Sequence, residues 1–306
     1  MKKVLFLILI CLSSSVIVAQ QEPLFAQYRT NAFVLNPAVA GSGDRHELRL
    51  NYRTQWTRFP GSPTTATFTY HGSVDDKNAI GFTAFNDALG PTNRMGLQLA
   101  YAFHIPVGMG GDRLSLGMAV KGLQYRFNSD EVYFQDRNDA AIAEASQGLI
   151  VGDVSFGLYY YNENFFAGFS APNLIQTDLD LGNTQSSRSI ISKLYRHYFA
   201  MMGYKFVYPN VSVEPSILMK KVQTAPYQIE GTVKFYIVND RIFFGGSYRT
   251  DWRMSLIFGF HTRNLQFVYS ADFMSKPIDV AGAIYGPSSE ITLGLDLGGN
   301  DHRYRR

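Results

Sequence analysis

The stretch MGLQLAYAFHI, residues 95–105, places a large apolar residue at every second position. Successive side chains of a β-strand point to opposite faces, so the pattern predicts a strand with one apolar face, made of Met95, Leu97, Leu99, Tyr101, Phe103 and Ile105. The runs RLSLGMAVKG (113–122) and EITLGLDLG (290–298) repeat this alternation. The chain is therefore predicted to be rich in strands with one apolar and one polar face.

The length and composition of these runs favour a membrane barrel over a soluble β-sandwich. They extend over about nine to fourteen residues, whereas strands of globular sheets average about five or six and tilted membrane strands about nine to eleven. Their polar faces carry Gly, Ser and Thr instead of the Lys and Glu of a soluble surface. Aromatic residues gather near strand ends, as at 159–161 and 165–166, which suits the interfacial girdles of outer-membrane barrels.

Alternation and turn residues together predict the topology. Connections after even-numbered strands are short and rich in Asn, Asp and Pro, whereas the longest connections follow odd-numbered strands, around 128–151, 172–194 and 274–289. Short periplasmic turns opposite long extracellular loops are typical of outer-membrane barrels. We expect an all-β fold, a transmembrane antiparallel β-barrel over 45–298 with a periplasmic tail at 299–306. Its strands, about fourteen, are predicted near 45–53, 64–73, 78–86, 93–105, 113–127, 152–161, 164–171, 195–207, 211–221, 227–237, 241–249, 253–261, 264–273 and 290–297.

The first nineteen residues predict export. Lys2 and Lys3 precede the apolar run 4–12, which is too short to span a bilayer, and Ala19 supplies a small residue before the expected cut. Cleavage would remove Cys11, the only cysteine, and leave 26 of the 28 basic residues against 25 acidic ones. This balance predicts no nucleic-acid partner, and the mature protein is expected in the bacterial outer membrane, in contact with its lipid.

Several motifs resemble one known family. QQEPLFAQYRTNAFVLNPAVAG (20–41) is followed by LNYRTQWTRFPGSPTTATF (50–68), and FFAGFSAPNL (165–174) comes later. Together they resemble the PorP/SprF family of the type IX secretion system, which shares an Asn-Pro-Ala box and an Arg-x-Gln-Trp motif. The C-terminal GNDHRYRR departs from many outer-membrane barrels because it lacks a terminal aromatic residue.

This resemblance implies an outer-membrane barrel for secretion, gliding or surface display, with no enzymatic activity and no cofactor. One branch of the family resembles a core component that meets the periplasmic ring or translocon of the machine. A larger branch accompanies very large surface proteins and is thought to export or anchor their C-terminal signal domains. The resemblance therefore implies a large secreted surface protein as partner.

The Arg-x-Gln-Trp motif ends the first predicted strand. Because side chains alternate between the two faces of a strand, Arg53 is expected to point into the lumen. Gln55 and Trp56 then lie just beyond it, at the extracellular rim. Arginine can donate several fixed hydrogen bonds, so the favoured reading is that the cluster locks the first loop over the barrel mouth. The alternatives are that it receives part of a secreted partner, or that it forms a sugar platform.

The Asn-Pro-Ala box, Asn36, Pro37 and Ala38, lies in the N-terminal segment 20–44, which we expect to be periplasmic or lumenal. The box predicts either an ordinary turn that leads into the first strand or a plug that folds back into the lumen. A comparable box occurs in barrels of the fatty-acid-transporter type. A fatty-acid-transporter-like or porin-like uptake barrel is therefore the main alternative function.

Charged residues of both signs fall on the predicted lumenal face. Unpaired ions in a narrow lumen would be costly, and a selective channel would show a ring of one sign. We therefore expect cross-strand pairs that stiffen the interior, formed by Arg49, Lys121, Glu214, Lys220, Glu230, Lys234, Arg249, Asp272 and Asp296.

Catalytic and metal-binding patterns are weak. The six histidines lack a His-x-x-x-His spacing, and no Gly-x-Ser-x-Gly elbow surrounds Ser170 or Ser247. DLDLGN (178–183) carries alternate carboxylates, but Ser189 stands where a calcium loop would place its glutamate. We expect no metal site, and an outer-membrane hydrolase with a triad assembled across strands is the weakest alternative.

Overall fold

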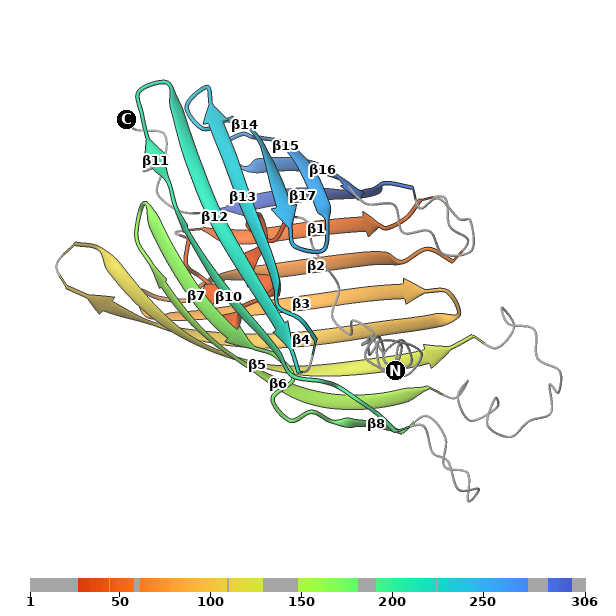
Figure 1. Ribbon diagram of the computed structural model, residues 1–306. Helices are drawn as coiled ribbons and strands as arrows, with labels where there is room; N and C mark the ends of the chain where they lie inside the picture. The colour runs from red at the N-terminus through yellow and green to blue at the C-terminus, as the bar shows by residue number, and fades with distance from the viewer. Residues whose placement is uncertain are drawn as a thin grey trace, which may run out of the picture.

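The strands of this chain close into an antiparallel β-barrel of fourteen strands (Figure 1). The structure is a computed structural model, and it describes residues 27–43, 45–57, 61–108, 110–128, 148–180, 191–223, 225–274 and 286–298. Each barrel strand pairs with the next barrel strand along the chain, including β7 with β10 and β10 with β12, and the barrel closes where β1 pairs with β17. The predicted fold class is confirmed, and the predicted strands match the observed ones to within a few residues.

The barrel strands of the first half are β1 (His46–Thr54), β2 (Thr64–Ser73), β3 (Asn78–Leu89), β4 (Thr92–Val107), β5 (Asp112–Phe127), β6 (Leu149–Tyr161) and β7 (Phe165–Ala171). The second half consists of β10 (His197–Tyr204) with its continuation β11 (Phe206–Val207), then β12 (Val211–Val222), β13 (Gln228–Ile237), β14 (Ile242–Arg249), β15 (Arg253–His261), β16 (Leu265–Met274) and β17 (Ser288–Leu297). A separate two-stranded sheet, β8 (Asp178–Asp180) with β9 (Ile191–Lys193), lies between β7 and β10 in sequence.

The two faces of the barrel wall differ as the alternation predicts. On β4, the side chain of Leu99 is 61% exposed, whereas its neighbour Ala100 is 7% exposed. Threonines of β2 point inward and are buried, while Phe68 between them is exposed. An apolar outer face of this kind suits contact with lipid acyl chains. Within the described residues, no helix is both long and apolar enough to cross a membrane.

The two ends of the barrel carry different connections. One end, the short-turn end, holds tight turns such as that between β2 and β3, where the Asp75 carboxylate accepts hydrogen bonds from Lys77 and Asn78. These bonds, led by the one from the Asn78 side chain, lower the pKa of Asp75. The opposite end, the long-loop end, holds the long connections after β1, β5, β7 and β16, together with shorter ones after β3, β12 and β14. The predicted contrast between short and long connections is therefore present.

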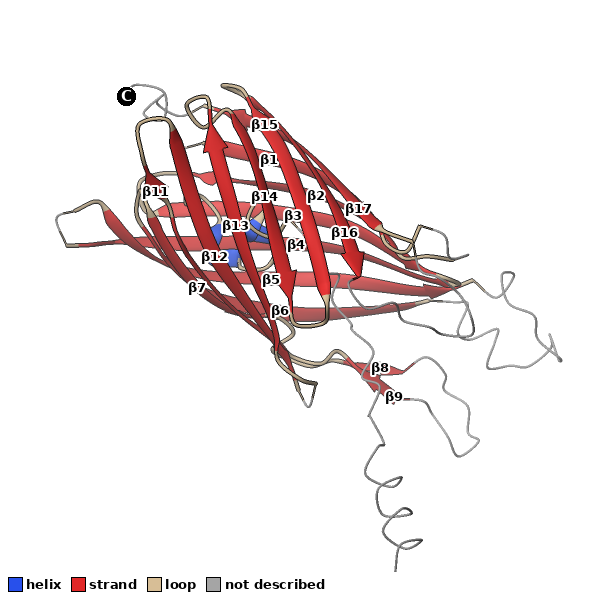
Figure 2. Ribbon diagram, turned by 45° about the horizontal axis from the view of Figure 1, so that its top comes forward, coloured by secondary structure: helices blue, strands red, loops and turns tan. Residues whose placement is uncertain are grey.

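The segment before β1 lies inside the barrel. Residues 27–43, which we call the plug, contain two short 3₁₀ helices, η1 (Ala32–Val34) and η2 (Pro37–Val39), that Figure 2 shows within the ring of strands. Phe33 and Ala38 are fully buried, and Tyr28 nearly so. These side chains pack against alanines of β3, β4 and β5 and form the main apolar cluster. The core of the protein is therefore the contact between plug and wall.

Candidate functional site

The plug sits against a wall of glycines on β5 and β6. Gly117 and Gly157 face each other in register, and both point into the lumen. A Cβ added to Gly117 would lie 2.2 Å from the Ala38 nitrogen, and one added to Gly157 would lie 2.0 Å from the Asn36 Oδ1 atom. Only glycine allows the backbone of the plug to approach this closely. The glycines therefore form a fitted seat for the Asn-Pro-Ala box.

Asn36 connects the plug to two strands. Its Oδ1 atom accepts a hydrogen bond from the Ala38 nitrogen (2.9 Å) and so caps η2, while Pro37 supplies the first helical position. Its Nδ2 atom donates to the carbonyl oxygens of Leu158 (2.9 Å) and Phe169 (3.3 Å) on β6 and β7. An asparagine amide both donates and accepts, so one buried side chain shapes the helix and fixes it to the wall.

Further hydrogen bonds run along the length of the plug. At the long-loop side, the Gln27 amide donates to the Glu290 carbonyl (2.9 Å) and to Ser270 (3.2 Å). At the short-turn side, the Gly41 nitrogen donates to His71 (3.3 Å) and the Gly41 carbonyl accepts from Ser73 (3.1 Å). The plug therefore passes down the lumen from the long-loop side to the short-turn side before β1 begins.

The opposite wall holds the plug through polar contacts. The Tyr28 hydroxyl hydrogen-bonds to Ser216 (3.2 Å), and the Arg29 guanidinium pairs with Glu214 on β12 (3.0 Å). Arg29 also lies over the Phe166 ring, 4.0 Å from its centroid. The plug thus meets small residues on one side and an ion pair on the other.

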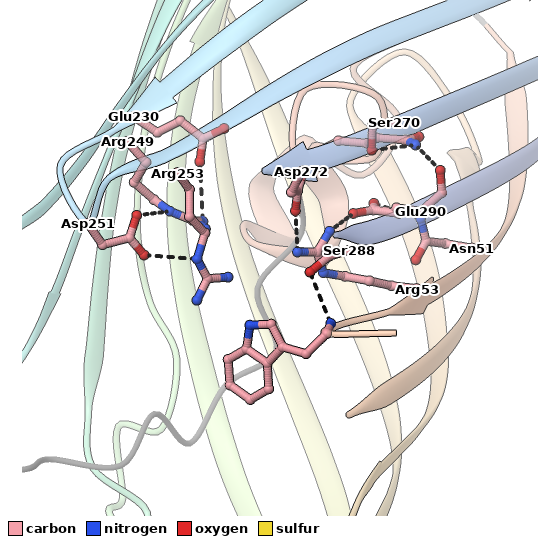
Figure 3. A network of polar contacts seen from close by, with 12 residues as sticks. Asn51, Arg53, Glu230, Arg249, Asp251, Arg253, Ser270, Asp272, Ser288 and Glu290 are labelled. Carbon is pink, nitrogen blue, oxygen red and sulfur yellow. Dashed lines mark hydrogen bonds and ion pairs between the residues drawn. The ribbon is translucent and has the colours of Figure 1, made fainter. Parts of the chain in front are cut away.

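A buried charge network lies toward the long-loop end (Figure 3). The Arg53 guanidinium donates to Glu290 (2.9 Å) and to Asp272, and Arg53 is 1% exposed. Asn51 donates to the same Glu290 carboxylate (2.8 Å). Arginine can serve two carboxylates at once because its donors form a rigid fork. The network ties β1, β16 and β17 together across the point where the barrel closes.

A second set of ions on β13–β15 appears in the same view. Arg249 pairs with Glu230 (3.4 Å) and with Asp251 (2.9 Å), and Asp251 also pairs with Arg253 (3.3 Å) (Figure 3). Asp251 lies in the turn between β14 and β15, so these pairs brace the long-loop rim of this wall.

The first loop leaves β1 at Gln55 and Trp56. The Gln55 nitrogen donates to the Pro63 carbonyl (2.9 Å), the Trp56 nitrogen to the Ser288 hydroxyl (3.3 Å), and the Thr57 nitrogen to the Pro287 carbonyl (3.3 Å). Trp56 has a φ of +52°, a left-handed conformation that is uncommon for a bulky residue. Hydrogen bonds from the loop's main-chain nitrogens to Pro63, Pro287 and Ser288 therefore hold the start of this loop.

Every residue of the predicted lumenal charge set is buried within the barrel: Arg49, Lys121, Glu214, Lys220, Glu230, Lys234, Arg249, Asp272 and Asp296. Arg49 pairs with Asp296 across β1 and β17 (2.5 Å), and Glu230 pairs with Arg249. Glu214 pairs with the plug residue Arg29, while Lys234 lies 3.5 Å from the plug residue Thr30. Both signs therefore line the lumen.

Two functional residues were missed by sequence reasoning. Glu290 lies in the last strand at an even separation from Asp296, and this spacing would have placed it on the same lumenal face. Arg29 lies in the plug, whose docking no strand periodicity describes. The two predicted terminal segments, the signal peptide 1–19 and the tail 299–306, fall outside the described residues. Among the residues that are described, no group of three or more His, Cys, Asp or Glu side chains is placed to hold a metal ion.

These features define a class of protein: an integral membrane barrel whose own N-terminal segment occupies its lumen. The chain belongs to the PorP/SprF family of type IX secretion system membrane proteins, whose family model matches residues 17–295. The predicted resemblance is confirmed. Membership in this family and the membrane-barrel fold together imply the outer membrane. A comparison with curated proteins gives no match.

Solved structures share the fold at low sequence identity. A Pseudomonas aeruginosa FadL homologue is 11% identical, with a TM-score of 0.53, over 86% of this chain and 92% of that chain. The CymD monoaromatic hydrocarbon channel is also 11% identical, with a TM-score of 0.52, over 93% and 96% of the two chains. The Ralstonia pickettii toluene transporter TbuX is 10% identical, with a TM-score of 0.50, over 88% and 93%. The family is one of secretion-system membrane proteins, and these solved structures share its barrel fold.

Proposed function

We propose that this barrel helps to export or to anchor at the cell surface one large secreted protein of the adhesin or gliding type, by engaging its C-terminal signal domain. The observation that carries the proposal is the plug: a lumen occupied by the protein's own chain suits a docking scaffold better than a wide pore. Membership in the type IX secretion family supplies the context of secretion-system components and cargo.

In this proposal, the rim and the lumen have different roles. Arg53 holds the end of β1 through Glu290 and Asp272, so the cluster of Arg53, Gln55 and Trp56 locks the first loop. The longer connections at 128–151 and 172–194 make most of the contact with the partner. The lumenal ion pairs and the Asn36-Pro37-Ala38 seat keep the barrel rigid and the plug in place.

The test uses cells of the native organism with the chromosomal gene deleted and then restored. The surface proteome, sampled by brief protease shaving, should lose one large exported protein on deletion and recover it on complementation. The same protein should copurify with the tagged barrel from gently solubilised outer membranes. An unchanged surface proteome in the deletion strain would refute the proposal.

An uptake barrel is the second candidate, and one observation favours it. A small cavity, partly open to solvent, adjoins the plug and is lined in part by Val34, Leu35 and Phe85. The structural neighbours include a hydrocarbon channel and a toluene transporter by their titles. Liposomes containing the purified barrel should take up toluene faster than empty liposomes if this reading is correct, and at an equal rate if the barrel is a scaffold.

A further inference from the structure

Two buried histidines hold the short-turn end of the plug. The Gly41 nitrogen donates a hydrogen bond to the Nδ1 atom of His71 on β2 (3.3 Å). The Ala40 carbonyl oxygen lies 2.9 Å from the Nε2 atom of His104 on β4. The ring of Phe33, also in the plug, packs against the His71 ring with 4.9 Å between the centroids. Two adjacent plug residues therefore depend on the side chain type that changes charge near neutral pH.

The two histidines respond differently to a proton. A backbone N–H only donates, so the Gly41 contact requires a His71 ring whose Nδ1 atom carries no proton. Both ring nitrogens of an imidazolium are donors, and the Nδ1 proton would then face the Gly41 N–H. His104 keeps its contacts in either form, because Nε2 donates to the Ala40 carbonyl and Nδ1 can accept from or donate to the Tyr161 hydroxyl (3.0 Å). Of the two contacts, only the one with His71 is incompatible with protonation.

The barrel wall can receive a protonated His71. The charged and titratable groups that act on its ring are Glu47, Arg49 and His46 on β1 and Asp296 on β17. The Glu47 carboxylate lies 4.0 Å from the Nε2 atom. On β3, the residue opposite His71 in register is Gly81, which carries no charge. His71 thus stands between a carboxylate of the wall and the main chain of the plug.

We propose that His71 is a pH-sensitive anchor for the short-turn end of the plug, residues 40–43. At neutral pH the unprotonated ring accepts the Gly41 hydrogen bond, and the end stays seated. Once the end has left, the ring meets lumenal water and takes up a proton as an ordinary histidine does, at about pH 6.5. Because the proton binds the released form and not the seated form, a fall in pH shifts the equilibrium toward release, by up to about tenfold per pH unit. Acid therefore loosens this end of the plug, and a return to neutral pH seats it again.

The test measures the mobility of the plug end directly, with the full-length barrel in lipid nanodiscs. A nitroxide spin label is attached at Ser42→Cys, a half-buried plug position, in a Cys11→Ala background that leaves one thiol. Electron paramagnetic resonance spectra at pH 8 and pH 5 span the range in which histidine changes charge. Carboxylates such as Glu214, the partner of Arg29, ordinarily lose their charge below about pH 5. The ratio of mobile to immobile label should rise by about thirtyfold from pH 8 to pH 5 and fall again on return.

Two histidine variants form a matched pair. His71→Asn places an amide oxygen near the position of Nδ1, where it can accept from Gly41 at any pH, and the amide does not titrate. Its label should have the same mobility at pH 8 and at pH 5. His104→Gln removes the other titrating ring and keeps an N–H donor for Ala40, so it should retain the full pH response. Heat-modifiable gel mobility shows whether each barrel is folded.

Three results would overturn the inference: equal label mobility at both pH values with both histidines present, an unchanged pH response in His71→Asn, or a lost response in His104→Gln. If His71→Asn does not fold, Glu47→Gln takes its place. Loss of the facing carboxylate makes the charged, released ring less favourable, so the midpoint of the transition should move to lower pH. A midpoint unchanged by Glu47→Gln would equally contradict the anchor.

Discussion

The two walls of the lumen hold the same plug in different ways. On β3–β6 many of the inward residues next to the plug are glycines and alanines, and the plug backbone lies directly against them. On β12–β17 and β1 many of the inward residues are charged or hydroxylic, and side chains such as Glu214 and Ser270 contact the plug. Shape complementarity therefore fixes the plug on one side, and hydrogen bonds and charges fix it on the other.

The comparison predicts that the largest effects lie on the charged wall. Arg53→Met would leave Asp272 and Glu290 buried without their shared cation, and breaking a buried pair in this way costs about 3–5 kcal/mol. The free energy of unfolding, measured by urea titration in detergent micelles with heat-modifiable gel mobility as readout, should fall accordingly. The triple variant Arg53→Met/Asp272→Asn/Glu290→Gln should regain most of the loss. A loss below about 1 kcal/mol in the single variant would show that the network is hydrated and weak.

The small-residue wall predicts an intermediate effect. Gly157→Val would place a side chain against Asn36, and overpacking of this kind typically costs about 1–3 kcal/mol. The plug should then leave its seat, and trypsin should cleave after Arg29, a site that we expect the seated plug of the wild type to protect. Gly152→Val is the matched control, because Gly152 lies on the same strand with no atom closer than 3.8 Å to an added Cβ. Equal protection of Arg29 in both variants would contradict the fitted seat.

The ion pair between the plug residue Arg29 and Glu214 on β12 tests how strongly the charged wall holds the plug. Arg29→Met removes the partner of Glu214, but Lys234 stands opposite Glu214 in register and can compensate. We expect a loss of about 1 kcal/mol in the free energy of unfolding, clearly less than for Arg53→Met. A loss as large as that of Arg53→Met would mean that the plug, and not the barrel closure, depends most on charge.

The smallest effect is expected at the rim. The hydrogen bond from the Trp56 nitrogen to Ser288 does not depend on the Trp56 side chain, so Trp56→Ala should change barrel stability by less than about 1 kcal/mol. Proteolysis within the first loop should nevertheless increase if the indole covers it. Trp252→Ala, at the β14–β15 turn, is the matched control. Loss of surface cargo in Trp56→Ala with a normally folded barrel would instead assign Trp56 to partner binding.

Much of the barrel could be predicted from the sequence. A strand that faces lipid on one side alternates apolar and polar residues clearly. The run 95–105 and its repeats therefore predict the number of strands and the face to which each side chain points, as for the outward Leu99 and the inward Ala100. The plug could not be predicted in the same way. Glycine on an inward face, as at Gly117, is compatible with a tight approach, a bulge or a water-filled lumen, and only the fold brings Asn36 onto it. The partner of Glu214 was likewise unpredictable, because Arg29 lies outside every strand pattern.

The most direct test of the account is the conductance of the purified barrel in planar lipid bilayers. The account predicts that the wild type shows no steady open channel, because residues 27–43 occupy the lumen, and that Gly157→Val shows opening events while Gly152→Val does not. A stable ohmic channel in the wild type, unchanged in Gly157→Val, would contradict the plug and with it the case for a docking scaffold.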